Sequence, residues 1–247
     1  MIFTGSHWYY GVIQIALVAV VVAVAVLATG RSRKVDTVVV WTIGAYLLFY
    51  KLNEYGPFKS FPLDLSAISY FLFGVAAFLP FRQLKSAAAF SAMLSGIIYV
   101  ATMTFFPETH IASLNSSDKF FLINMAMCNH NLLLLGSIFM TAQLEVKRED
   151  VVCLVGWFGF FFAYLNLLVT ACGVSYKNSS IIGIIDGSLV AGVLGMDVTP
   201  AFGAVYYTVC LFVFGALVAL FILLNRFLTR RYRKFLPPLV RRADIFA

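Results

Sequence analysis

The apolar residues of this chain gather into seven long runs, and this pattern limits the fold more than any other feature. Each run has close to the roughly 20 residues that a helix needs to cross about 30 Å of hydrocarbon. Charged residues make up only 12% of the chain, against roughly 25% in an average soluble domain, which excludes a soluble surface. We predict an all-α polytopic membrane helix bundle of seven transmembrane helices. The predicted spans are 10–28, 36–55, 62–80, 88–106, 119–141, 150–172 and 203–225.

The basic residues fall mainly on one side of these spans. Of the 18 Lys and Arg residues, 14 lie in the connections after spans one, three, five and seven. Because cytoplasmic loops carry an excess of Lys and Arg, this pattern places the N-terminus outside and the C-terminus in the cytoplasm. It predicts a multi-pass protein of the cell membrane, typical of a bacterial cytoplasmic membrane. The net charge of +7 belongs to loops and tail, so no nucleic-acid partner is predicted.

The chain is expected to form one transmembrane domain over residues 1–225, followed by a basic cytoplasmic tail over 226–247. The first apolar run lacks a basic segment before it, so we interpret it as a span rather than as a cleaved signal. The tail alternates basic and aromatic residues, which suits binding to anionic lipid headgroups or a simple topological anchor. The Gly- and Ser-rich stretch 174–202 is too interrupted to span, and is expected to form an outer cap or a re-entrant segment.

The sequence lacks the patterns of the common cofactor and metal sites. It has no Gly-rich phosphate loop, and its three histidines are widely separated. Its four cysteines lie inside apolar runs without C-x-x-C spacing, and we interpret them as reduced packing residues. No cofactor and no metal are predicted, and membrane lipids are the expected partners. The oligomeric state is left open.

His130 is the ionisable residue placed nearest the middle of a predicted span. Asn124, Cys128 and Asn131 share one face of the same helix, and His130 points about 100° away from them. A neutral imidazole can exchange a proton near neutral pH, which suits a general base. The alternative is a structural hydrogen bond between helices, which contributes about 0.6 kcal/mol on average in membranes.

Ser66 is a candidate nucleophile near the start of the third span. It becomes reactive only if a base such as His130 reaches its hydroxyl, and the alternative is that it is a small residue of helix packing. Because Ser66 lies close to the membrane edge and His130 near the middle, the pair requires a span that starts earlier or tilts. Asp64 precedes Ser66 and points toward another side of the helix.

Two further polar positions stand out. Lys51 and Glu54 lie one turn apart at the outer end of the second span and are expected to form an interfacial ion pair. Asn166 in the sixth span lacks a polar neighbour on its own helix except Tyr164, and is expected to line a central cavity together with His130.

These segments together resemble the YwaF-like bacterial membrane proteins, which are similar to the transmembrane-protein-164 acyltransferases. The resemblance covers most of the chain. It is carried by Gly5-Ser6-His7-Trp8, Phe61-Pro62-Leu63-Asp64-Leu65-Ser66, Asn129-His130-Asn131-Leu132-Leu133-Leu134-Leu135-Gly136 and Tyr164-Leu165-Asn166.

The resemblance implies a seven-helix fold and, in the characterised branch, acyl transfer to lysophospholipids by a cysteine and a histidine. The histidine corresponds to His130 and the cysteine to Ser66, with Asp64 at the place of a further histidine. Replacing a thiol by a hydroxyl changes the activation that the nucleophile needs, because a hydroxyl is not ionised at neutral pH.

Three functions follow from these residues. The first is a lipid acyltransferase or hydrolase, with Ser66 and His130 as catalytic residues and Asn124, Asn131 or Asn166 binding the substrate. The second is a transporter, channel or ligand-binding bundle, in which His130, the asparagines and Asp64 line a polar path. The third is a structural membrane protein without enzymatic activity, in which the same residues only hold helices together.

Overall fold

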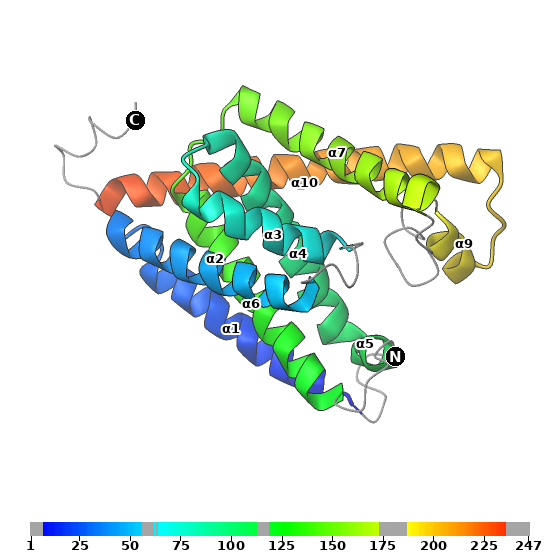
Figure 1. Cartoon of the computed structure of the whole chain (residues 1–247), viewed down its shortest axis with the longest axis horizontal. Coiled ribbons are helices and arrows are strands. Elements are labelled where there is room, and N and C mark those ends of the chain that lie inside the picture. Colours follow the sequence, from blue (N-terminus) through cyan, green and yellow to red (C-terminus); the bar gives the residue numbers. More distant parts are fainter. Residues whose placement is uncertain (1–6, 56–61, 63, 113–118, 173–186, 236–247) are drawn as a thin grey trace.

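The computed structural model describes residues 7–55, 62, 64–112, 119–172 and 187–235, and all regular elements in these ranges are helices (Figure 1). The helices are α1 (Tyr9–Ala28), α2 (Arg33–Tyr55), α3 (Leu65–Phe78), α4 (Arg82–Phe105), α5 (Pro107–Ala112), α6 (Lys119–Ala142), α7 (Arg148–Cys172), α9 (Ser188–Leu194) and α10 (Pro200–Phe235). The predicted all-helical class is confirmed for the described residues.

Six of the described helices are long and apolar enough to cross a membrane, namely α1, α2, α4, α6, α7 and α10. The third predicted span forms α3, which has only 14 residues. At about 1.5 Å per residue, α3 is roughly 21 Å long and does not reach across the hydrocarbon by itself. The seventh predicted span forms part of α10, whose 36 residues continue through the expected domain boundary at 225. Part of the expected cap (174–186) and of the tail (236–247) lies outside the described residues.

The connections with most basic residues meet at one end of the bundle. Asp36, at the start of α2, accepts a hydrogen bond from the backbone N–H of Gly30 at 2.9 Å. Thr37 donates to Gln143 in the connection between α6 and α7. The side chain of Arg231 near the end of α10 donates to the carbonyl of Val26. The ends of α1, α6 and α10 and the start of α2 therefore lie together, as the alternating charge pattern predicts.

Helix α6 is the centre of the packing, since it contacts α1, α2, α3, α4 and α10. Glycines permit the closest approaches. A Cβ atom on Gly96 of α4 would lie 2.8 Å from the Cβ of Leu134 and 3.3 Å from the carbonyl oxygen of His130, both on α6. A Cβ on Gly44 of α2 would lie 2.6 Å from the Cβ of Ala77 on α3. Small residues at these positions let helix backbones approach closely, as is typical of membrane bundles.

Helices α7 and α10 are packed much less fully than the helices around α6. Figure 1 shows α7, α9 and the first half of α10 extending away from the other helices. In the most apolar part of α10 only 11% of the residues are buried, against 50% in α6. Phe158 of α7 and Phe214 of α10 pack edge to face near their junction with Phe90 of α4. Most of the apolar surface of these two helices therefore faces outward, as lipid-facing surface does.

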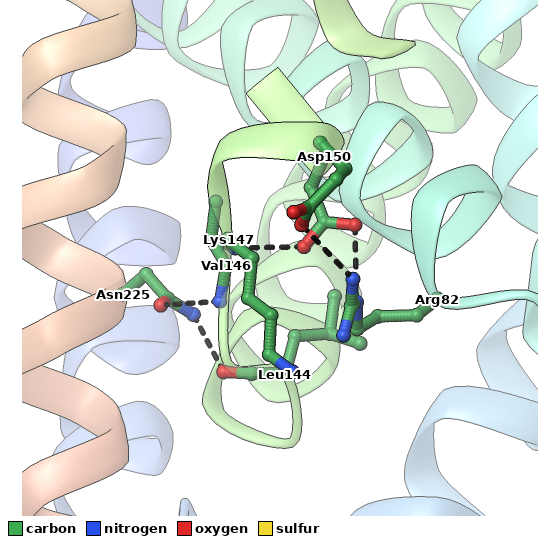
Figure 2. A network of polar contacts seen from close by, with 7 residues as sticks. Arg82, Leu144, Val146, Lys147, Asp150 and Asn225 are labelled. Atoms are coloured by element: carbon green, nitrogen blue, oxygen red, sulfur yellow. Dashed lines mark hydrogen bonds and ion pairs between the residues drawn. The ribbon is translucent and has the colours of Figure 1, made fainter. Parts of the chain in front are cut away.

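A polar network fixes α10 to the connection between α6 and α7 (Figure 2). The Asn225 side chain donates to the carbonyls of Thr141 and Leu144, both at 2.8 Å, and accepts from the backbone N–H of Val146 at 3.2 Å. Thr229, one turn further along α10, also donates to the carbonyl of Leu144. The side chain of Asn225 thus bonds to three backbone groups at the end of α6 and in the following turn. These groups lie where the hydrogen bonds of the helix end.

The same turn is held from its other side by α4. Asp150, which is fully buried at the start of α7, accepts from Nε of Arg82 at 3.0 Å and from the backbone N–H of Lys147 at 2.7 Å. The guanidinium of Arg82 also lies 3.7 Å from the Glu149 carboxylate. Figure 2 shows Arg82 and Asn225 approaching the turn from opposite sides. The buried carboxylate is therefore paired, which its burial requires.

Two of the cysteine predictions are wrong. Cys128 of α6 and Cys153 of α7 are exposed on the outer surface of their helices rather than packed inside the bundle, while Cys210 is half-buried. All three are free thiols. The helices are apolar on several sides, so an apolar neighbourhood in the sequence does not distinguish an inward position from a lipid-facing one.

We expect Asn225→Leu to lower the free energy of unfolding by about 1 to 3 kcal/mol, because the Val146 N–H loses its partner and the Thr141 and Leu144 carbonyls each lose one of theirs. Thermal unfolding of the purified protein in detergent measures this loss, and limited proteolysis of the turn should become faster. Asn53→Leu is the matched control, since Asn53 is exposed and donates only to the carbonyl of Phe49 on its own helix. Equal losses in the two variants would contradict a role of Asn225 in holding α10.

Candidate functional site

His130 lies at the middle of α6, buried between two tyrosine rings. The ring of Tyr99 on α4 stacks on the imidazole, with centroids 3.8 Å apart and an interplanar angle of 8°. The ring of Tyr70 on α3 meets it edge-on at 5.4 Å. His130 therefore joins three helices, and its predicted position deep in the bundle is confirmed.

The hydrogen bond of His130 fixes its tautomer. Nδ1 lies 2.8 Å from the carbonyl oxygen of Ala126, which can only accept, so Nδ1 carries the proton. The lone pair is then on Nε2, and within the described residues Nε2 forms no hydrogen bond. This arrangement leaves an imidazole nitrogen that can accept a proton or a hydrogen bond.

Ser66 does not hydrogen-bond to His130. It is the second residue of α3 and is half-buried, and no hydrogen bond to its hydroxyl is formed by the described part of the chain. The α3 residue that contacts His130 is Tyr70, one turn further on and about 6 Å along the helix axis. Because α3 starts at Leu65 rather than earlier, the difference in depth between Ser66 and His130 expected from the sequence remains.

Asn131 points to a different neighbour from His130. Its side chain and that of Gln14 on α1 exchange two hydrogen bonds of 3.3 Å, and its amide also donates to the carbonyl of Met127 at 2.8 Å. Asn124 is half-buried and donates to the carbonyl of Phe120 on its own helix. Of the three residues predicted to share a face, Asn131 is buried, Asn124 is half-buried and Cys128 is exposed.

Asn129 is fully buried and faces α2. Its side-chain oxygen accepts a hydrogen bond of 2.8 Å from the hydroxyl of Tyr46. Its amide nitrogen lies near the Tyr50 hydroxyl but forms no hydrogen bond of good geometry within the described residues, and the hydroxyl of Tyr70 has no partner there. Asn129 and Tyr70 are both only 1% exposed. An unpaired buried polar group costs roughly 1 to 3 kcal/mol, so two of them beside His130 need an explanation.

Lys51 lies at the outer edge of this cluster and is only 7% exposed. Its ammonium pairs with Glu54 at 2.5 Å, which confirms the predicted ion pair, although the lysine is buried rather than interfacial. The ammonium also lies 5.3 Å from the ring centroids of Tyr50 and Tyr55 and 4.9 Å from that of Tyr70. These distances are within the range of cation–π attraction. Three phenol rings and one carboxylate therefore surround a buried cation.

The two other predicted binding residues lie at exposed positions. Asp64, at the start of α3, is exposed and interacts electrostatically with Lys51. Asn166 is exposed on α7, where it donates to the carbonyl of Phe162. The described residues do not bring Asn166 and His130 together, since Asn166 is exposed on α7 and His130 is buried between α3 and α4, so a shared cavity stays a prediction.

A second polar group lies at the end of the bundle where α1 begins. The Tyr99 ring that stacks on His130 also lies 5.0 Å from the ring of His110 on α5, whose Nε2 is 2.8 Å from the Thr102 hydroxyl. Burial lowers the pKa of His110 from its ordinary value of 6.5, so this ring is neutral at pH 7. His7 binds Glu108 through its backbone N–H at 2.7 Å and through Nδ1 at 2.9 Å.

Sequence reasoning did not identify Gln14 or Tyr99 as parts of the site, and it named Asn129 only as one of the asparagines around His130. The available signal for Gln14 was a single amide in an otherwise apolar span, which in a bilayer requires an internal partner. Tyr99 carried no such signal, because tyrosine is common at membrane interfaces. Within the described residues, no group of three or more His, Cys, Asp or Glu side chains is placed to hold a metal ion.

Comparison with known proteins finds no matching family model, no matching curated protein and no matching solved structure.

We expect Gln14→Leu and Asn131→Leu to be coupled, because each single change leaves the other amide buried with fewer partners. The sum of the losses in unfolding free energy of the two single variants should exceed the loss of the double variant. The difference should be about 0.6 to 2 kcal/mol, the range for polar pairs between membrane helices. Thermal unfolding in detergent measures this coupling. The control cycle combines Gln14→Leu with Asn124→Leu, whose effects should add because Asn124 bonds to its own helix. Additive effects in both cycles would contradict the pairing.

Proposed function

We propose that this chain is a multi-pass protein of the cell membrane that binds a polar ligand at the cluster of Tyr70, Asn129 and His130. The observation that carries the proposal is that the Tyr70 hydroxyl and the Asn129 amide nitrogen are buried without a hydrogen-bond partner in the described part of the chain, beside His130, whose Nδ1 is already paired with the carbonyl of Ala126. They belong to adjacent helices, and Tyr70 and His130 are in ring contact. Buried polar groups in membrane bundles commonly mark ligand and ion pathways.

The unpaired groups offer both donors and acceptors. The Asn129 amide nitrogen donates, Nε2 of His130 accepts, and the Tyr70 hydroxyl can do either. A ligand that pairs with them offsets the free energy that the unpaired groups cost, so binding is favoured where water is scarce. A purely structural role explains the Gln14–Asn131 pair, whose side-chain oxygen and nitrogen atoms are bonded, but it does not explain these three atoms.

We predict that Tyr70→Phe raises the unfolding temperature of the ligand-free protein, because it removes a buried hydroxyl that has no partner. The gain should correspond to about 1 kcal/mol in unfolding free energy. The same variant should lose any stabilisation that choline, inorganic phosphate or glycerol gives to the wild type in a thermal unfolding assay. Tyr207→Phe is the matched control, since Tyr207 is exposed on α10. No stabilisation of the wild type by any of the three probes, or equal stabilisation of Tyr70→Phe, would contradict the proposal.

The proposed topology has seven spans, with the N-terminus outside and the C-terminus in the cytoplasm. It is supported by the basic connections that meet at one end of the bundle and by α3, which packs against both α2 and α4 despite its short length. The excess of Lys and Arg at that end supports a cytoplasmic position for it, because cytoplasmic loops are enriched in basic residues. Anionic lipid headgroups are then the natural partners of the basic residues on α10 and the tail.

We expect green fluorescent protein to fluoresce when fused after Leu79 or at the C-terminus, because both positions are then cytoplasmic. Alkaline phosphatase fused after Phe106 should be active, because that position is outside. Each fusion point is tested with both reporters, which report opposite sides. An active phosphatase after Leu79 would show that α3 does not cross the membrane.

Acyl transfer is the second proposal, and the tautomer of His130 favours it. With its proton on Nδ1, the imidazole presents Nε2 as a base, as a histidine that activates a serine must. Ser66 lies one helical turn before Tyr70, so substrate binding or a movement of α3 would have to bring its hydroxyl to Nε2. The resemblance to the YwaF-like and transmembrane-protein-164 proteins suggests lysophospholipids as acyl acceptors.

If this second proposal holds, the protein in phosphatidylcholine liposomes transfers acyl chains to added lysophosphatidylethanolamine. His130→Ala and Ser66→Ala should each lower the rate by at least about 100-fold, since each removes one member of the pair. Ser86→Ala is the control, because it removes a buried serine hydroxyl of α4 that is not part of the proposed catalytic pair and should leave the rate unchanged. Full activity of Ser66→Ala would exclude Ser66 as the nucleophile.

A further inference from the structure

We infer that the ligand of the proposed site is a small organic cation that takes the place of the Lys51 ammonium among Tyr50, Tyr55 and Tyr70. The inference rests on the proposed function and names the chemical class of its ligand. Its basis is the surroundings of the buried Lys51 ammonium. Three phenol rings enclose it, the unpaired Tyr70 hydroxyl belongs to one of them, and the exposed Glu54 carboxylate pairs with it.

The rings already show that they accept an ammonium group. All three centroids lie within 5.3 Å of the Lys51 nitrogen, inside the roughly 6 Å limit for cation–π attraction. They come from α2 and α3, so the enclosure is built by two packed helices rather than by one flexible segment. Aromatic enclosures of this kind are the common solution for binding quaternary ammonium ligands.

The charges around the enclosure favour a cation over an anion. Glu54 pairs with Lys51 at 2.5 Å, and Asp64 interacts with it electrostatically. When the Lys51 ammonium leaves the enclosure, the Glu54 carboxylate loses its cationic partner, and a ligand cation can replace it. Both carboxylates are exposed, so they form a rim that attracts cations from the aqueous side.

The Lys51 side chain can leave the enclosure when a ligand enters. It lies in the last turn and a half of α2, which ends at Tyr55. A lysine near a helix end can extend its four-carbon stem so that the ammonium reaches water. Lys51 thus acts as an internal occupant that holds the enclosure closed when no ligand is bound and competes with the ligand for it.

The unpaired polar atoms lie on the inner side of the same enclosure. The ring of Tyr70 contacts both the Lys51 ammonium and the imidazole of His130. On α2, the ring of Tyr50 lies 6.4 Å from that of Tyr46, and Tyr46 in turn donates to Asn129. A ligand with a cationic group and a nearby hydroxyl can fill the enclosure and also pair with these atoms. Choline is the simplest probe with that chemistry.

The test compares choline with 3,3-dimethylbutanol, which has the same shape without the charge, by thermal unfolding and calorimetric titration of the full chain in detergent. Choline should bind the wild type, and the neutral compound should bind at least about tenfold more weakly. Lys51→Met should raise the affinity for choline about tenfold because the competing ammonium is gone. Lys119→Met, at an exposed position, should leave it unchanged.

Two further variants keep the inference testable if Lys51→Met does not fold. Glu54→Gln changes an exposed side chain and should weaken choline binding at least about threefold, and Tyr50→Leu should do the same by removing one ring. Binding of the neutral compound as tightly as choline would overturn the inference. Stabilisation by phosphate or glycerol alone, lost in Tyr70→Phe, would overturn it while leaving the proposed function standing. No binding of any probe would overturn both.

Discussion

The structure depends on one constraint: a polar side chain inside a membrane bundle must find its partner on another helix, because hydrocarbon offers none. Helix α6 carries three consecutive polar residues at its middle, and consecutive residues on a helix point about 100° apart. Asn129 therefore meets Tyr46 on α2, His130 meets Tyr99 on α4 and Tyr70 on α3, and Asn131 meets Gln14 on α1. This short polar segment places α6 at the centre of the bundle and assigns a neighbour to each of its sides.

The two parts of the molecule are stabilised in different ways. Around α6, glycines bring backbones into direct contact, so that even a methyl group on Gly96 or Gly44 would meet another helix. Along most of α7 and α10 there is no such contact, and Gly156, Gly159 and Gly215 have open space beside them. Helix α10 is instead held near one end, where Asn225 binds the backbone of the preceding turn. The site accordingly lies in the tightly packed part, where side chains keep a fixed geometry.

The sequence alone was sufficient for the all-helical class and for six helices long and apolar enough to cross a membrane, because run length is a local property of the chain. It was insufficient for the direction of individual side chains. Cys128 and Asn131 lie on one side of an ideal helix, yet one is exposed and the other is buried, because α1 covers only part of that side. Lys51 was expected at the interface, but the rings of α2 and α3 enclose it. Such outcomes depend on which helix lies next to which residue, and hydropathy along one chain does not contain that information.

The unpaired atoms of Tyr70 and Asn129 are unusual because a more stable alternative is one substitution away. A phenylalanine at position 70 would keep the ring contacts with His130 and Lys51 and would remove the buried hydroxyl, and a leucine at 129 would remove the buried amide. Selection for stability alone favours those residues. Ser69 of α3 shows the paired outcome, since it bonds both to Ser91 of α4 and to the carbonyl of Leu65, whereas Ser86 and Ser95 of α4 are buried without a partner among the described residues. Tyr70 and Asn129 nevertheless keep their unpaired polar atoms, close to the buried Lys51 ammonium. A ligand that pairs with these atoms in the working protein gives a reason for keeping them.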